Sequence, residues 1–93
     1  MFFKGNKKIK FSDCLWQHVR EKRRMMVDDL VKQKILLNLN KQEVLDLLGF
    51  EFNDSNSNTW TYYIDRRRFV FSSKRYLSIF FDNKGLVYKT TFS

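Results

Sequence analysis

The sequence contains no proline, three glycines, one cysteine and one histidine, and these shortages exclude several kinds of structure and site. Without proline and with little glycine, the chain has few enforced breaks, so its turns must be formed mainly by Asn, Asp and Ser. Because Cys14 is the single cysteine, an internal disulfide and a thiolate cluster for a metal ion are excluded. No apolar run approaches the ~20 residues that a membrane-spanning helix needs.

Cys14 and His18 are the residues that raise the question of a metal or catalytic centre. Their spacing places them one helical turn apart, but structural zinc takes four ligands and the sequence has no other Cys or His. A nucleophilic cysteine would also need a shaped pocket and a group that orients its histidine. Gly49 and Gly85 are isolated, so they form no phosphate-binding loop. We therefore predict no metal, no cofactor and no enzymatic activity.

The charge balance is basic, because 18 Lys and Arg residues outnumber 10 Asp and Glu residues and give a net charge of +8. The basic residues fall in short clusters at 7–10, 20–24, 66–68 and 74–75. Such a balance attracts polyanions, anionic lipid or an acidic partner, and it is equally typical of a solvated surface that keeps a small domain soluble. Hydrophobic residues make up 43% of the chain and aromatic residues 17%, which indicates a folded domain and not a disordered one.

The first ten residues include four lysines instead of the apolar stretch of about 7 to 15 residues that a secretory signal requires. We expect residues 1–12 to be a basic, loosely ordered lead and residues 13–93 to form a single domain. The lysines of the lead also suit contact with an anionic membrane. The compartment stays open at this point: cell envelope or periplasm if an export signal was trimmed, cytoplasm if the chain is complete as written.

A long amphipathic helix is predicted over about residues 14–34. Apolar residues recur there on one helical stripe, while charged residues occupy the other faces. The stripe consists of Val19, Met26, Val27, Leu30 and Val31. Trp16 lies on the same side, three residues before Val19, and is predicted to fill the core rather than to present a platform for a ligand.

A second helix is predicted to begin after Asn40. This residue can cap the helix, and Glu43, three residues later, can reach back to the amide of Asn40 and complete a capping box. Gly49 is placed to end the helix in a left-handed conformation, after which we expect Phe50 to fold back onto Leu45.

The pattern changes from a helical period to a period of two after a polar loop at residues 53–58. Alternation over 60–65 and 76–81 predicts two strands, and Asp82–Gly85 predicts a hairpin loop into a last strand over 86–92. The order of elements predicts an α+β fold, with two N-terminal helices packed on one face of a three-stranded antiparallel sheet. A short additional strand after the first would make the sheet four-stranded.

Four segments form a distinctive combination: residues 24–30 (Arg-Met-Met-Val-Asp-Asp-Leu), residues 39–49 with Glu43-Val44 and Leu47-Leu48-Gly49, Trp60-Thr61-Tyr62, and residues 77–87 with Asp82-Asn83-Lys84-Gly85. In this combination, over about residues 16–92, the sequence resembles the SmpA/OmlA (BamE-like) family, which shares its architecture with the β-lactamase inhibitor protein. The resemblance implies two helices on a three-stranded antiparallel sheet and a bacterial envelope setting. It also implies a role carried out by protein contacts instead of chemistry.

A mixture of aromatic and basic side chains in the second half of the chain is the strongest candidate for a functional surface. Helices on one face of a sheet leave the other face available, and aromatic side chains with basic neighbours would form an adhesive platform there. We predict that a partner protein docks on it, with aromatic anchors and with arginines that steer its approach. The candidate residues are Tyr63, Arg66, Arg67, Arg68, Arg75, Tyr76 and Phe80.

Two alternatives remain beside this prediction. A small basic nucleic-acid-binding protein would use the same composition, with bases stacked on aromatic rings and arginines at phosphates. We favour a protein partner, because no strand matches the aromatic motif of RNA-recognition domains and the helices lack a recognisable DNA-reading arrangement. The other alternative is that the aromatic residues divide between core and rim and form no site.

Overall fold

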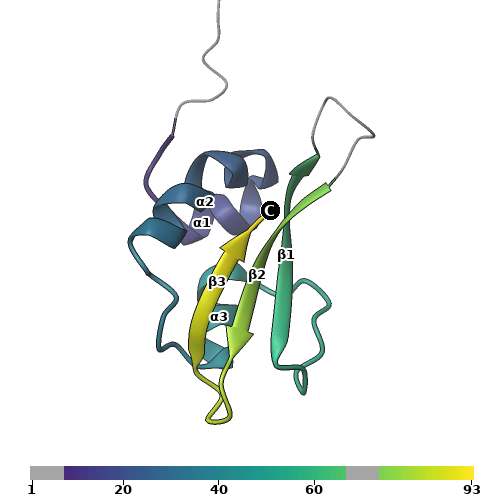
Figure 1. Cartoon of the computed structure of the whole chain (residues 1–93). Helices are drawn as coiled ribbons and strands as arrows, with labels where there is room; N and C mark the ends of the chain where they lie inside the picture. Colours follow the sequence, from purple (N-terminus) through teal and green to yellow (C-terminus); the bar gives the residue numbers. More distant parts are fainter. Residues whose placement is uncertain (1–7, 67–73) are drawn as a thin grey trace, which may run out of the picture.

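The computed structural model describes residues 8–66 and 74–93 as a helical layer packed on one face of a three-stranded antiparallel sheet (Figure 1). The elements are α1 (Asp13–His18), the 3₁₀ helix η1 (Arg20–Lys22), α2 (Arg23–Lys32), α3 (Lys41–Leu48), β1 (Thr59–Arg66), β2 (Lys74–Phe81) and β3 (Val87–Phe92). The predicted α+β class and three-stranded sheet are confirmed. The additional strand considered between β1 and β2 would fall on residues that lie outside the described part of the chain.

The long helix predicted over residues 14–34 is divided into three pieces. α1 begins after Ser12, whose side-chain oxygen accepts a hydrogen bond from the Leu15 amide, and it ends at His18. Val19 then leaves the helical region with φ −128° and ψ 83°, and the chain continues through η1 into α2. The prediction of one continuous helix is therefore wrong at Val19. An apolar stripe indicates which side of the chain is buried, but it contains no mark of a break where neither glycine nor proline is present.

α2 ends at Lys32 in a pair of hydrogen bonds that satisfy its last carbonyls. The Ile35 amide donates to the Leu30 carbonyl at 3.3 Å, and the Lys34 amide donates to the Val31 carbonyl at 3.1 Å. Lys34 takes a left-handed φ of 54°, as the residue after a helix end does in this motif. Since glycine is the usual residue at that position, the sequence shows no mark of this helix end.

α3 begins with the predicted capping box. The Asn40 side-chain oxygen accepts from the Glu43 amide at 2.8 Å, and the Glu43 carboxylate accepts from the Asn40 amide at 2.9 Å. Gly49 follows the helix with a positive φ of 82°, and its amide donates to the Leu45 carbonyl at 2.8 Å. Both ends of this helix therefore lie where the capping residues predict them.

The sheet has the order β1-β2-β3, and helices cover only one of its faces (Figure 1). The covered face carries the buried side chains Trp60, Tyr62, Ile64, Leu77, Ile79, Phe81 and Val87. The helical layer contributes Trp16, Met26 and Leu30 to the same core, so the prediction that Trp16 fills the core is confirmed. The alternating pattern predicts the inward face of each strand correctly because side chains along a strand point to opposite faces in turn.

Residues 8–12 lie along α2 and are attached to it by backbone groups. The Ile9 amide donates to the Met25 carbonyl at 2.9 Å, and the Phe11 amide donates to the Asp29 carboxylate at 2.8 Å. The described part of the predicted lead is therefore held against the domain by hydrogen bonds.

Candidate partner-binding surface

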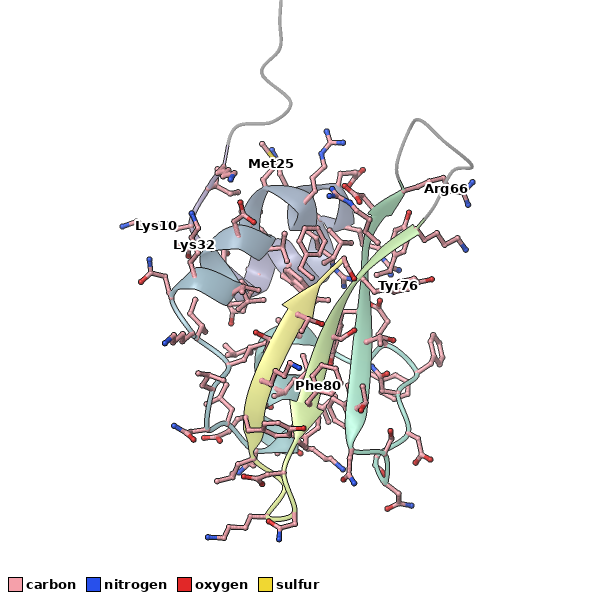
Figure 2. The ribbon with its side chains drawn as sticks, in the orientation of Figure 1. Lys10, Met25, Lys32, Arg66, Tyr76 and Phe80 are labelled. Carbon is pink, nitrogen blue, oxygen red and sulfur yellow. The ribbon has the colours of Figure 1, made fainter. Side chains whose placement is uncertain are left out.

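The face of the sheet that no helix covers, called here the outer face, carries aromatic side chains from all three strands. Tyr63 of β1 lies opposite Tyr76 of β2, and their rings meet edge to face with centroids 5.9 Å apart. Further along β2, the Phe80 ring lies 6.5 Å from that of Tyr88, and the Lys89 ammonium lies 5.4 Å from its centroid. Figure 2 shows Tyr76 and Phe80 at separate places along β2. The outer face therefore carries two aromatic pairs.

Small polar side chains separate these two pairs. Thr61, Ser78 and Thr91 are neighbours across the three strands, in register with one another. Tyr76 is 38% exposed and Tyr88 is 58% exposed, while Tyr63 and Phe80 are half-buried by their neighbours. The face thus combines apolar area with hydroxyl groups, which is the composition of a surface that can bury an anchor and orient it by hydrogen bonds.

Arg75 does not lie on the outer face, although it directly precedes Tyr76. A register shift between Tyr63 and Asp65 brings Asp65 opposite Arg75, and the two side chains form paired hydrogen bonds of 2.7 Å each. The guanidinium also lies 4.8 Å from the centroid of the Phe92 ring. The hydrogen bonds from Arg75 to Asp65 raise the pKa of Arg75. Arg75 is therefore engaged inside the domain, on the side of the sheet opposite to Tyr76.

The remaining arginines of the prediction lie beyond or at the end of β1. Arg66 is exposed at the last position of β1, opposite Lys74 (Figure 2). Arg67 and Arg68 fall outside the described residues. The structure thus brings Tyr63, Tyr76 and Phe80 together on one face and leaves Arg66 at the end of its strand.

Arg23 belongs to the basic cluster at residues 20–24, yet its side chain is buried and only 4% exposed. It donates hydrogen bonds to the Trp16 carbonyl at 3.0 Å, to the Glu51 carboxylate at 2.8 Å and to the Tyr63 carbonyl at 2.9 Å. Its guanidinium also lies 4.9 Å from the centroid of the Trp16 ring. The interpretation of this cluster as a solvated surface is therefore wrong for Arg23, and no feature of the sequence distinguishes it from its neighbours.

The free edge of β1 is closed by side chains of the segment that follows α3. Asn53 donates to the Thr61 carbonyl at 3.0 Å and accepts from the Thr61 amide at 3.1 Å. The Glu51 carboxylate accepts from the Tyr63 amide at 2.6 Å, while Arg23 binds the Tyr63 carbonyl. These contacts satisfy the outward backbone groups of two successive outward-facing residues, as a neighbouring strand would do.

Two phenylalanines of the same segment alternate with these polar residues and point into solvent. Phe50 is 67% exposed and Phe52 is 90% exposed, and their rings pack edge to face at 5.1 Å. Phe50, which we expected to fold back onto Leu45, therefore packs on Phe52 instead. Phe52 also has a positive φ of 59°, which is unusual for a bulky residue.

Neither the metal prediction nor the membrane prediction gains a candidate from the described residues. Cys14 and His18 are both exposed on α1. Within the described ranges, no three His, Cys, Asp or Glu side chains are grouped as a metal site would require. No helix in this part of the chain has the length and apolar character needed to cross a bilayer.

Comparison of the chain with protein-family models, with curated proteins and with solved structures found no match in any of the three. The resemblance to the SmpA/OmlA family therefore stays a prediction.

Proposed function

We propose that this domain is a non-enzymatic protein-interaction module of the SmpA/OmlA (BamE-like) type, which docks a partner protein through the outer face of its sheet. The observation that carries the proposal is the pair of aromatic clusters on a face that no helix covers. Tyr63 with Tyr76, and Phe80 with Tyr88, offer ring surface to solvent on either side of a polar strip. Such aromatic residues are frequent anchors of protein interfaces because they bury large area at little conformational cost.

The charges around this face support a partner that is acidic or of mixed charge. Lys89 lies over the Phe80 ring, and Arg66 and Lys74 are exposed at the far ends of β1 and β2. We propose that Arg67 and Arg68 extend this basic end. Exposed charges at a rim contribute mainly to the rate and specificity of association, whereas the aromatic anchors contribute the affinity.

The experiment that tests the proposal is site-specific photocrosslinking in the source cells. A photoreactive phenylalanine replaces Tyr76 on the outer face, or His18 on the exposed side of α1 as the matched control. We expect a protein adduct from position 76 that survives nuclease treatment, and none from position 18. Adducts that disappear with nuclease would instead support the nucleic-acid alternative, whose affinity should fall steeply with added salt.

Substitutions then show which side chains bind the crosslinked partner. Tyr76→Ala combined with Phe80→Ala should weaken binding by about tenfold or more, because interface anchors commonly contribute this much. Phe52→Ala is the control, since it removes an exposed aromatic side chain that lies off the outer face. Circular dichroism checks that each variant is folded.

Two results would count against the outer face. One is a folded double variant that binds the partner with unchanged affinity. If the double variant does not fold, Thr61→Arg places a long side chain on the polar strip without removing a ring, and unchanged binding by this variant would also contradict the proposal.

A further inference from the structure

β3 forms the second edge of the sheet, and only its first residue is covered. The Val87 amide donates to the Leu39 carbonyl at 2.9 Å, and the Asn38 amide donates to the Val87 carbonyl at 2.8 Å. Residues 33–37 belong to the turn that connects this contact with the end of α2. Figure 1 shows this connection running beside β3 before it reaches α3.

The rest of the β3 edge has outward backbone groups that no described residue binds. Tyr76 and Ser93 exchange two hydrogen bonds, of 2.9 and 3.2 Å, so the backbone of Ser93 faces β2. In an antiparallel ladder this direction alternates, which turns the amide and carbonyl groups of Thr90 and Phe92 away from β2. Among the residues that the structure describes, none forms a hydrogen bond with these outward groups.

A groove of about 270 Å³ lies beside this open edge. Its lining residues are Val31, Lys34, Leu36, Leu37, Tyr88, Lys89 and Thr90. Its apolar part comes from α2 and the following turn, and its charged part consists of two exposed lysines without an acidic neighbour in the lining. Figure 2 shows Lys32, at the end of α2, on the same side of the molecule as β3.

We propose that the open part of the β3 edge binds an extended, acidic segment of a partner protein as a fourth strand. Its backbone pairs with Thr90 and Phe92, an apolar side chain enters the groove, and carboxylates lie near Lys34 and Lys89. This site is separate from the outer face and goes beyond the function proposed above, because it specifies a second contact with its own chemistry.

The backbone groups and the charge together select this occupant. An open strand edge offers alternating donors and acceptors at the spacing of another strand, which an extended peptide matches. A second copy of this chain would bring the lysines of two β3 edges close together, and like charges across an interface are unfavourable. A nucleic acid would satisfy the lysines but lacks the backbone pattern that pairs with a strand.

The test uses the full chain and a fluorescein-labelled octapeptide of alternating glutamate and leucine, blocked at both ends. This pattern places leucines on the groove side and glutamates on the other side of the added strand. Fluorescence anisotropy gives the affinity, and amide hydrogen exchange followed by NMR gives the place of binding. We expect the peptide to protect the amides of Thr90 and Phe92 and to leave the Thr61 amide, on the closed edge, unchanged.

Variants separate backbone pairing from charge. Thr90→Pro removes an amide that points away from β2, so it should leave the ladder intact and weaken peptide binding by about tenfold. Lys34→Glu should weaken it by about fivefold at low salt, whereas Lys84→Glu, the same change in the hairpin loop, should alter it by less than about twofold. A peptide N-methylated at the amides that face β3 should not bind, and this control leaves the protein unaltered even if Thr90→Pro fails to fold.

Each other outcome overturns the inference in a recognisable way. The inference is wrong if a millimolar excess of peptide leaves Thr90 and Phe92 unprotected, or if the N-methylated peptide binds equally well. Peptide-induced shifts confined to Tyr76 and Phe80 would contradict the edge site while supporting the outer face. Protection of the β3 edge that grows with protein concentration alone would identify the occupant as a second copy of the chain.

Discussion

The two edges of the sheet are treated in opposite ways. The edge of β1 is closed by side chains, because Asn53, Glu51 and Arg23 bind the outward backbone groups of Thr61 and Tyr63. The edge of β3 is covered by backbone only at its first residue and is open beyond it. A segment that forms no strand can therefore substitute for one when its side chains have the right spacing.

The difference between the edges also assigns them different tasks. The closure of β1 includes the buried guanidinium of Arg23, which would be left without partners if another strand displaced Glu51. The β1 edge is thus committed to the interior of the domain. The β3 edge has no such commitment among the described residues, and basic side chains border it. Lysines on an open edge discourage pairing between identical copies.

Removing the buried guanidinium should break the comparison most strongly. We expect Arg23→Met to lower the free energy of unfolding by about 3 kcal/mol, because Glu51 loses its buried partner and two carbonyls lose their donor. Urea titration followed by circular dichroism measures this change. Arg24→Met is the matched control at an exposed position and should change stability by less than about 0.5 kcal/mol. Equal effects of the two substitutions would show that Arg23 does not hold the β1 edge.

Tyr62 tests the anchor at the start of the segment that closes β1. Its hydroxyl donates to the Gly49 carbonyl at 2.8 Å, and burial, with a smaller effect of Glu51, raises the pKa of Tyr62 well above its ordinary value. The folded state therefore keeps a proton that the unfolded chain loses above about pH 10. Stability is fully present below that pH and should fall by about 1.4 kcal/mol per pH unit above it.

Tyr62→Phe isolates this effect. At neutral pH the variant should be less stable than the wild type by about 1 kcal/mol, because it lacks the hydrogen bond. The difference should shrink and reverse as the pH rises towards about 12, since the variant has no proton to lose at this position. Tyr88→Phe, at a residue that is 58% exposed, should follow the wild-type pH profile. Parallel profiles for wild type and Tyr62→Phe in urea titrations would contradict the predicted effect.

Hydrogen exchange compares the two edges directly. In the wild type, the amide of Thr61 should exchange about tenfold more slowly than that of Thr90, because Asn53 binds only the former. Asn53→Ala should remove this difference and cost about 1 kcal/mol of stability. Asn58→Ala, a change at an exposed neighbouring asparagine, serves as the control and should leave the Thr61 amide protected. A Thr61 amide that exchanges as fast as Thr90 in the wild type would show that the β1 edge is not closed in solution.

The smallest expected effect concerns the backbone of the closing segment. Phe52 has a φ of 59° and is 90% exposed, so its side chain contributes little burial to offset the strain. We expect Phe52→Gly to be more stable than Phe52→Ala by about 0.5 kcal/mol, because both lose the ring but glycine adopts a positive φ without steric strain. Thermal unfolding of the two variants measures the difference. A more stable alanine variant would mean that the segment relaxes to another conformation.

The elements that were predicted correctly are those whose cause lies in neighbouring residues. Asn40 and Glu43 form their capping box within one helical turn, and the strands follow from side chains that alternate between core and solvent. The break at Val19 and the end of α2 before Lys34 were not predicted, since the residues there are not the ones that normally mark such positions. Local chemistry is visible in a sequence, whereas a break imposed by packing is not.

The candidate surface divides along the same line. Alternation within single strands placed Tyr63, Tyr76 and Phe80 correctly on one face. Arg75 was placed with them only because it adjoins Tyr76, and a register shift in β1 gave it Asp65 as a partner. The open edge of β3 could not be predicted at all, because the order of the strands and the path of residues 33–39 decide which strand lacks a neighbour.

The sequence by itself determined the two-layer α+β architecture, the inward face of each strand and the capping of α3, since each depends on the period and identity of residues close together in the chain. Only the tertiary structure decided that Arg23 is interior, that Arg75 faces the helices, and that one sheet edge is closed while the other is open. The reason is physical: whether a charge or a backbone group is satisfied depends on partners brought together from distant parts of the chain, and their separation in sequence carries no trace of that meeting.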